Sequence, residues 1–256
     1  MTPILSELGK GGDVRNPYGL RWFFLVSSLV VLVEMSACAV VGGLPLGEDS
    51  WKEEVLLHDG SKLVITRSQT YGGSHEIGQP PPIKEHTVAF TLPHTNKTIT
   101  WSSEYGKEVG RTNFHLLAVH VLNGTPYIVA EPNLCLSYNK WGRPNPPYVF
   151  FKYDGAAWQR IPVEAFPSEF TTINVALSTI GSKGADLVRQ GVVSSEKIKE
   201  VNRHTVNPDH NTILRAQVKL GTEGSAVNCL EMVFYKGAWV GPGDSIGKRM
   251  KDRDSK

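Results

Sequence analysis

The chain has 256 residues, of which 40% are hydrophobic and 20% are charged, with 27 Lys and Arg residues against 25 Asp and Glu residues. This composition excludes a collagen-like, coiled-coil, disulfide-dense or wholly disordered chain, and it is typical of one ordinary domain or two small ones. The net charge of +2 creates no field that would attract a nucleic acid, so no nucleic-acid partner is expected.

The amino terminus has the pattern of a secretory signal peptide over residues 1–37. A 12-residue run without a charged side chain, from Trp22 to Val33, follows Arg15 and Arg21 and precedes two small residues at 36 and 37. A helix of that length spans about 18 Å, whereas the hydrocarbon core of a bilayer is about 30 Å thick. An uncleaved membrane anchor is the alternative, but it would place Glu34 inside the bilayer at a cost of roughly 2.5–3.5 kcal/mol.

The residues Met35-Ser36-Ala37-Cys38 resemble the lipobox of bacterial lipoproteins, in which an aliphatic residue and two small residues precede a cysteine that receives diacylglycerol. The resemblance implies that Cys38 is lipidated and begins the mature chain. The alternative is a cut by the ordinary signal peptidase at Ala37-Cys38-Ala39, which would release a soluble periplasmic protein. Because Ala39 is not the Asp that often retains lipoproteins in the inner membrane, the resemblance favours the periplasmic face of the outer membrane over an inner-membrane anchor.

Two cysteines remain if Cys38 carries a lipid, and they are candidates for a disulfide. Cys135 and Cys229 each lie in an apolar run that is typical of a strand, NLCLSY and VNCLEMVF, and an exported chain meets an oxidising compartment. A bridge requires Cα atoms within about 7 Å and would stabilise the fold by roughly 4–5 kcal/mol. Two separate buried thiols are the alternative, and the sequence leaves the choice open.

Between Trp51 and Val163 the dominant pattern is of short strands separated by turn residues. Four successive hairpins are predicted, namely 54–57 with 62–67, 87–92 with 98–103, 114–122 with 127–130, and 148–153 with 158–161. Successive hairpins pair antiparallel, since parallel strands need a long crossover. The predicted fold class is all-β to α+β, an antiparallel β-meander that forms a sandwich or a small barrel, with a short helical insertion.

The run 114–122 predicts a central strand that is covered on both sides, because both of its faces are apolar. Strict alternation places His120 on the face of Phe114, Leu116, Ala118 and Leu122, and His115 on the other. The two histidines should therefore point to opposite faces and share no metal.

The insertion covers about residues 166–210, with helices predicted at 184–190 and at 194–203, the second capped by Ser194. Strands are expected to resume at 213–220 and 226–239, and the final hairpin to return to the sheet. The predicted organisation is a linker at 38–50, one β-rich domain at 51–241 and a basic, disordered tail at 242–256. Residues 248–256 hold five basic and two acidic side chains, so this tail could bind an anionic lipid or polymer.

Two histidines and a carboxylate, His204, Asp209 and His210, lie within seven residues and are the candidate ligands of a metal ion. Their spacing matches no strong motif and Pro208 marks a loop, so a solvent-exposed loop without metal is the favoured interpretation. No cofactor is expected from the sequence.

The Pro-rich connection from Tyr138 to Tyr148 is the candidate binding surface, with Tyr138, Trp141, Arg143 and Tyr148 as its residues. Ring faces flanked by amide and basic side chains are typical of surfaces that stack on sugars or hold a protein. The alternative is that Trp141 folds back over a sheet end.

A Gly-rich loop at 71–78 brings Ser74, His75 and Glu76 together, but neighbours in a chain do not form a catalytic triad. The sequence has no G-x-S-x-G, H-E-x-x-H, P-loop or dinucleotide-binding pattern. No catalytic residue is therefore predicted.

Two functions remain open from the sequence. The first is an exported, lipid-anchored cell-envelope protein that acts as a binding or accessory module, with the membrane as one partner and an envelope protein or glycan as another. The second is an exported hydrolase that acts on envelope polymers. A pocket with convergent titratable groups would favour the hydrolase, and a flat aromatic patch would favour the binding module.

Overall fold

The computed structural model describes residues 47–92, 95–205 and 207–254, and the chain from Gly47 onward forms one compact unit. The signal peptide and the lipobox with Cys38 lie outside the described residues. Among the helices of the described ranges, none is long and apolar enough to cross a membrane.

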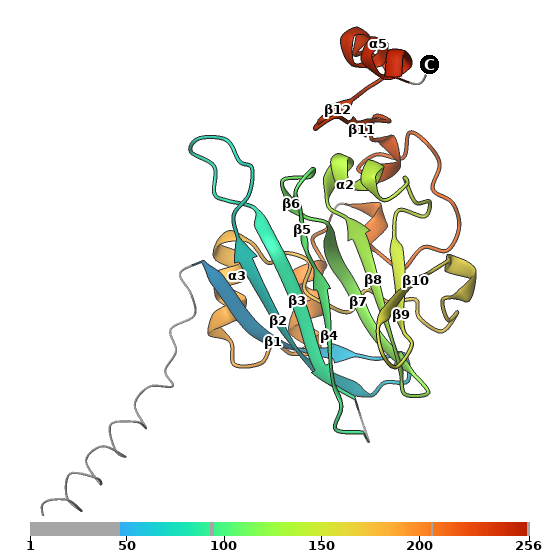
Figure 1. Cartoon of the computed structure of the whole chain (residues 1–256). Helices are drawn as coiled ribbons and strands as arrows, with labels where there is room; N and C mark the ends of the chain where they lie inside the picture. Colours follow the sequence, from blue (N-terminus) through green and yellow to red (C-terminus); the bar gives the residue numbers. More distant parts are fainter. Residues whose placement is uncertain (1–46, 93–94, 206, 255–256) are drawn as a thin grey trace, which may run out of the picture. The chain divides into compact units, whose positions relative to one another are not determined.

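Two antiparallel four-stranded sheets form a β-sandwich (Figure 1). The first sheet has the order β1-β2-β3-β4, with strands at Glu48–Leu56, Lys62–Tyr71, Ile83–Thr91 and Thr98–Ser103. The second has the order β10-β9-β8-β7, with β7 at Phe114–Leu122, β8 at Thr125–Pro132, β9 at Val149–Tyr153 and β10 at Trp158–Ile161. All four predicted hairpins are confirmed. Of the two predicted architectures, the sandwich is observed and the small barrel is not. Strand β1 begins at Glu48, so the predicted linker at 38–50 extends too far.

The main core lies between the inner faces of the two sheets. It is formed by residues such as Ile65, Val88, Phe90, Trp101, Phe114, Leu116 and Ile128. A second cluster covers the outer face of β7, β8 and β9 with Phe166, Phe170 and Ile213, which belong to the insertion and the segment after it. Strand β7 is thus covered on both faces as predicted, although it lies at the edge of its sheet and not in the centre.

A β-bulge in β7 overturns the predicted alternation. The register shifts between Leu116 and Ala118, so that Leu117 has no partner on β8. As a result Val119 faces the core between the sheets, while Leu117 and Ala118 both pack with Phe170 on the outer side.

The bulge also places the two strand histidines on the same face, contrary to the prediction. His115 pairs with Glu131 and His120 with Tyr127, and these partners lie four positions apart on β8. Four positions on one strand correspond to about 13 Å. Distance, and not orientation, keeps the two imidazoles from sharing a ligand.

His120 makes the stability of the sandwich sensitive to acid. Its Nε2 lies 3.0 Å from the Thr172 carbonyl oxygen, its ring stacks on Phe170, and burial lowers its pKa to about 4. As the pH falls from about 6.5 toward 4, the unfolded chain takes up a proton that the folded chain excludes, and stability on the order of 3 kcal/mol is lost. We expect His120→Gln to lose less stability than the wild type between about pH 7 and pH 4.5, measured by urea unfolding. Equal losses in both proteins would contradict this assignment.

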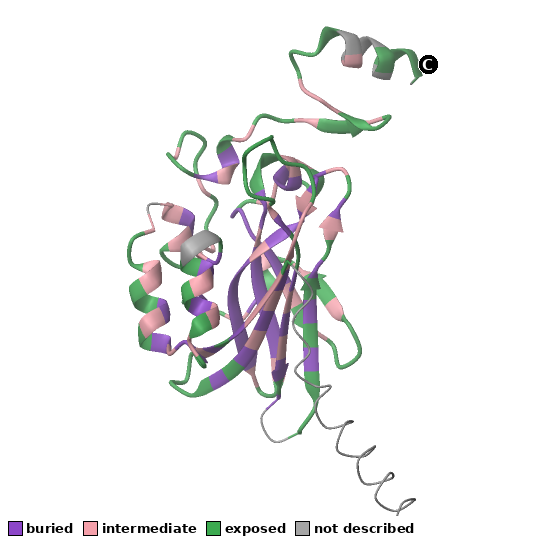
Figure 2. Ribbon diagram, turned by 90° about the vertical axis from the view of Figure 1, so that its left-hand side faces the viewer, coloured by how far each residue is buried: buried purple, intermediate pink, exposed green. Residues whose placement is uncertain are grey.

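The predicted helical insertion is confirmed as α3 at Gly181–Arg189 and α4 at Ser195–Asn202, with short 3-10 turns at Val163–Ala165 and Pro208–His210. Ser194 caps α4 as predicted, because its hydroxyl accepts a hydrogen bond from the Lys197 amide at 3.2 Å. Both helices cover β1 (Figure 2), where Val193 pairs in parallel with Glu53.

A buried ion pair ties the insertion to the first sheet. The Glu53 carboxylate is fully buried and accepts hydrogen bonds from Trp51 Nε1 at 2.7 Å, Arg67 Nη1 at 2.8 Å and the Ala176 amide at 3.1 Å. Arg67 also donates to the Ala176 carbonyl oxygen at 2.8 Å. These contacts offset the cost of burying the two charges, because an unpaired charge in such a site is strongly unfavourable.

The segment after residue 210 differs most from the prediction. Residues 211–225 form coil and turns instead of a strand, and a 3-10 turn follows at Ala226–Asn228. Strands β11 at Val233–Tyr235 and β12 at Ala238–Val240 pair only with each other among the described strands, so this hairpin does not return to the main sheets. Glycines at 221 and 224 adopt positive φ angles, which interrupt any extended run.

Helix α5 at Ser245–Asp254 replaces the predicted disordered tail. The Asp244 carboxylate accepts a hydrogen bond from the Gly247 amide at 2.8 Å, and Tyr235 and Lys236 both bind Asp254 at the other end. The sequence interpretation also missed the two-residue strands β5 at Tyr105–Gly106 and β6 at Arg111–Thr112.

Candidate functional site

The predicted binding surface is largely part of the interior. Tyr138 lies on helix α2 (Leu134–Lys140) and, like Tyr148, is only 2% exposed. The Tyr148 hydroxyl donates to the carbonyl oxygens of Asp209 at 2.5 Å and Thr212 at 3.1 Å. Trp141 is half-buried, and its ring lies 4.5 Å from that of Phe114. The prediction that these rings are open to a partner is therefore wrong for both tyrosines, and Trp141 folds over the sheet end.

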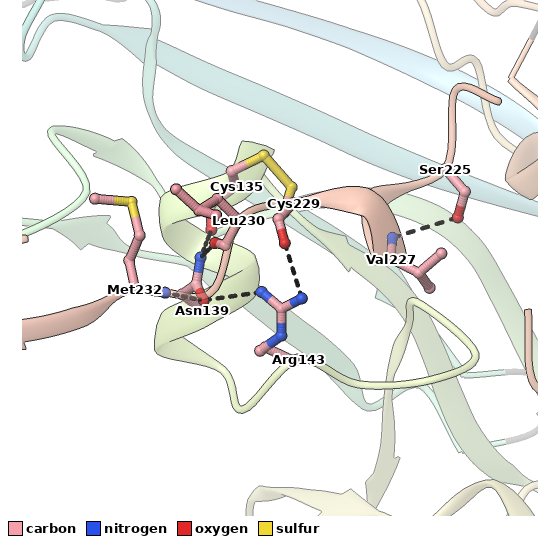
Figure 3. Close-up of a disulfide and its surroundings, with 8 residues drawn as sticks. All are labelled: Cys135, Asn139, Arg143, Ser225, Val227, Cys229, Leu230 and Met232. Atoms are coloured by element: carbon pink, nitrogen blue, oxygen red, sulfur yellow. Dashed lines mark hydrogen bonds between the residues drawn. A yellow bond between two sulfur atoms is a disulfide. The ribbon is translucent and has the colours of Figure 1, made fainter. Parts of the chain in front are cut away.

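The polar side chains of the same connection bind the chain's own C-terminal segment (Figure 3). Arg143 Nη2 donates to the Cys229 carbonyl oxygen at 2.8 Å, and its guanidinium lies over the Tyr138 ring. Asn139 donates to the Leu230 carbonyl oxygen and accepts from the Met232 amide, both at 2.9 Å. The connection does form a docking surface, but residues 229–232 of the same chain occupy it.

A disulfide reinforces this contact. Cys135 and Cys229 are joined, with their Cα atoms 5.3 Å apart (Figure 3). Neither residue is in a strand, contrary to the prediction, since Cys135 lies on α2 and Cys229 follows the 3-10 turn at Ala226–Asn228. The bridge therefore fixes the C-terminal segment to α2 and not two strands of a sheet to each other.

The strongest candidate site is a polar cavity of about 340 Å³ where α4 ends. Seven of its lining residues have polar side chains and come from α3, from α4, from the coil before α3 and from the segment after α4, namely Ser178, Lys183, Asn202, His204, Thr205, Asn207 and His210. None of the described residues that line it is acidic. A cavity with this lining favours a ligand rich in hydrogen-bond acceptors or carrying negative charge.

His210 connects the cavity to a carboxylate on the second sheet. Its Nε2 lies 2.9 Å from Glu131 Oε1, and its Nδ1 lies 3.4 Å from Thr205 Oγ1. Burial alone would lower the pKa of His210, but its hydrogen bond with Glu131 and the negative charges of Glu131 and Asp209 outweigh burial and raise the pKa above its usual value. A titratable pair of this kind beside a cavity is typical of binding and catalytic sites.

The three candidate metal ligands do not form a metal site. His204 and His210 both line the cavity, but Asp209 is 1% exposed and lies outside its lining. Burial raises the pKa of the Asp209 carboxyl, although the Ser225 side chain and the Ala226 amide oppose the rise. No group of three or more ligating side chains in the described part of the chain could hold a metal ion.

The three candidate residues of the Gly-rich loop do not contact one another in a catalytic arrangement. The Ser74 amide donates to the Gly110 carbonyl oxygen at 2.9 Å, His75 Nδ1 lies 3.0 Å from the Gly73 carbonyl oxygen, and Glu76 accepts from Gln79 at 3.1 Å. These contacts give no arrangement of nucleophile, base and orienting group.

Sequence reasoning missed Glu131, Lys183 and Thr205, because residues that meet from separate elements leave no local pattern. A second cavity of about 490 Å³ lies at the ends of β9 and β10. Its lining has side chains of both charges, Lys97, Lys152 and Asp154, and no histidine among its described residues.

No family model, no curated protein and no solved structure matches this chain.

Proposed function

We propose that this protein is an exported cell-envelope binding module, anchored by a lipid on Cys38, that holds an anionic or acceptor-rich ligand in the polar cavity. The signal-peptide pattern and the lipobox resemblance support the export and the anchor. An envelope glycan that carries carboxylate or phosphate groups is the partner whose chemistry fits the lining.

The lining of the cavity is the observation that carries the proposal. Lys183 and His204 line it and are exposed, and the raised pKa of His210 favours the protonated form of that imidazole. Lys183, His204 and His210 thus line a space whose described lining holds no acidic side chain. Charge of one sign around a concave site attracts ligands of the opposite sign.

An NMR titration tests whether the cavity binds anions. The chain from Ala39 onward is titrated with glucuronate and, separately, with inorganic phosphate. We expect shifts of the lining residues with either anion, and little shift with uncharged glucose. Lys183→Glu should weaken binding by about tenfold or more, since it reverses the charge of the lysine at the site. Binding should also weaken as the pH rises through the raised pKa of His210, because the imidazole then loses its charge.

The matched control is Lys152→Glu, which makes the same charge change in the lining of the second cavity. Binding should be unchanged in this variant. If both substitutions weaken binding equally, or if neither anion shifts the lining residues, the cavity is not the binding site.

The lipid anchor makes a separate prediction. Mass spectrometry of the membrane fraction should find a mature chain that begins at acylated Cys38, and Cys38→Ala should move the protein out of that fraction. An intact leader, or an unmodified start at Ala39, would contradict the anchor and leave the cavity proposal standing.

A second candidate function is favoured by the order Thr205, His210, Glu131, which matches a nucleophile, a base and an orienting carboxylate. In this hydrolase, Thr205 Oγ1 would attack the carbonyl carbon of an ester and give its proton to His210 Nδ1. His210 would then pass this proton to the alcohol that leaves. Water would cleave the acyl group from Thr205 and release the acid. The pH dependence of the hydrolase would be opposite to that of anion binding. Its activity would rise as the pH passes the raised pKa of His210, since the base must be neutral.

Assays of the cleavage of simple esters distinguish the hydrolase from the binding module. The hydrolase requires ester cleavage that Thr205→Val and Glu131→Gln both abolish, while Lys183→Glu leaves the folded protein active. Absence of cleavage by the wild type, together with anion binding, would leave the binding module as the function.

A further inference from the structure

We propose that Asn96 and Asn123 are attachment sites for oligosaccharides, which a transferase moves onto their side-chain amides from a donor that carries the sugars on a lipid diphosphate. Attachment at these residues goes beyond the cavity and requires only the proposed export of the chain, because asparagines of this kind are glycosylated in exported proteins.

Both asparagines begin the acceptor pattern of N-linked glycosylation, Asn-x-Ser/Thr, in which x is any residue except proline. The two triplets are residues 96–98, Asn-Lys-Thr, and residues 123–125, Asn-Gly-Thr. No other asparagine of the sequence has Ser or Thr at the second position after it. Because so short a pattern also arises by chance, its place in the fold decides whether an enzyme can use it.

Each asparagine lies at the tip of a β-hairpin. Asn96 is in the turn between β3 and β4, and Asn123 forms with Gly124 the two-residue turn between β7 and β8. Both asparagines are exposed and have φ angles of 52° and 50°, in the left-handed region that asparagine tolerates better than most residues. An enzyme can therefore reach either side chain without separating the strands that the turn connects.

The side-chain amides of these two residues are also free. Most asparagine side chains of the described residues form hydrogen bonds within the chain, namely those of Asn113, Asn133, Asn139, Asn145, Asn174, Asn202, Asn207 and Asn228. The side chains of Asn96, Asn123 and Asn211 form none with the described residues, and all three are exposed. Two of these three free amides therefore begin an acceptor pattern, while none of the hydrogen-bonded asparagines does.

The transfer needs a free amide because the amide nitrogen is the nucleophile. The nitrogen attacks the anomeric carbon of the first sugar, so that a C–N bond forms and the bond from this carbon to the diphosphate oxygen breaks. The lipid diphosphate leaves with the electron pair, and the amide gives one proton to a base of the transferase. An amide that donates hydrogen bonds within the fold would first have to lose them.

The two sites lie at the same end of the sandwich (Figure 1), where Lys97 and Gly124, the middle residues of the two patterns, both line the second cavity. The hydroxyl that completes each pattern belongs to the first residue of a strand, Thr98 in β4 and Thr125 in β8. Oligosaccharides at both turns would flank the second cavity. No residue of either pattern is among the described lining of the polar cavity, so the modification would leave the proposed ligand site open.

Peptide mass spectrometry of the protein from its native cells tests the two sites. We expect the peptides that contain Asn96 and Asn123 to carry the mass of an oligosaccharide and to release sugar fragment ions. Asn96→Gly and Asn123→Gly should each abolish the modification of their own peptide, because glycine keeps a left-handed turn without strain but has no amide side chain. Thr98→Val and Thr125→Val should do the same, whereas Thr98→Ser and Thr125→Ser should retain the modification.

Asn211→Gln is the matched control, since it removes the third free and exposed amide, which has Ile213 at the second position after it. Both modified peptides should be unchanged in this variant. Unmodified peptides from native cells would overturn the proposal. So would sugars that remain in Asn96→Gly and Asn123→Gly, because they would then be attached to hydroxyl groups. The same spectra show whether the leader has been removed, so a failure of export is distinguished from a failure of glycosylation.

Discussion

Replacing Glu53 by Ala is expected to lower the free energy of unfolding by about 3–5 kcal/mol, as is usual when one partner of a buried ion pair is removed. The Arg67 guanidinium would remain in the interior, with its side chain 4% exposed and its main counter-charge gone. The Ala176 amide and Trp51 Nε1 would lose their acceptor at the same time. Urea unfolding of the chain from Ala39 onward measures the change.

The neighbouring residue supplies the control. Glu54 forms its ion pair with Lys62 at the surface, where solvent screens the interaction. Glu54→Ala should therefore have only a small fraction of the effect of Glu53→Ala. Replacing Glu53 by Leu together with Arg67 by Met should recover most of the lost stability, since the double variant leaves no buried charge. Equal effects of Glu53→Ala and Glu54→Ala would contradict the role assigned to the buried pair.

Replacing both Cys135 and Cys229 by Ser is expected to lower the free energy of unfolding by about 4–5 kcal/mol. The bridge joins residues 94 positions apart, and closing so long a loop removes much of the conformational entropy of the unfolded chain. Urea unfolding should also show a matching loss when the wild type is treated with a reducing agent.

The reduced protein has a second expected property. Asn139 and Arg143 still bind residues 229–232, so the C-terminal segment should loosen without leaving the sandwich disordered. Hydrogen exchange should therefore rise first in residues 226–254. An unfolding curve that reduction leaves unchanged would show that the bridge adds nothing to stability.

The strand pairing was predictable because its signals are local. Asp59 accepts hydrogen bonds from the Ser61 amide and hydroxyl in the first hairpin turn, and Asn123 and Gly124 adopt the positive φ angles that a two-residue turn requires. The bulge at Leu117 was not predictable, because it depends on the register with β8 and on Phe170 from the insertion. One extra residue in one strand exchanges the two faces for every residue that follows.

The candidate sites show a different limit of the sequence. The residue types of the connection from Tyr138 to Tyr148 predict a surface for an external partner, but they do not reveal that residues 229–232 of the same chain bind there. The cavity was missed in part, because Glu131 is 79 positions from His210 and no spacing rule connects them. The helix at 245–254 was missed because its contacts with Tyr235 and Lys236 are tertiary.

The most direct test of the binding proposal is photo-crosslinking from position 204 in intact cell envelopes. A photoreactive residue in place of His204 lies at the rim of the cavity, and mass spectrometry identifies what becomes attached. We expect a discrete adduct with an anionic glycan or another acidic envelope component, which Lys183→Glu removes and Lys152→Glu does not. No adduct from position 204, or the same adducts from a photoreactive residue at position 152, would contradict it.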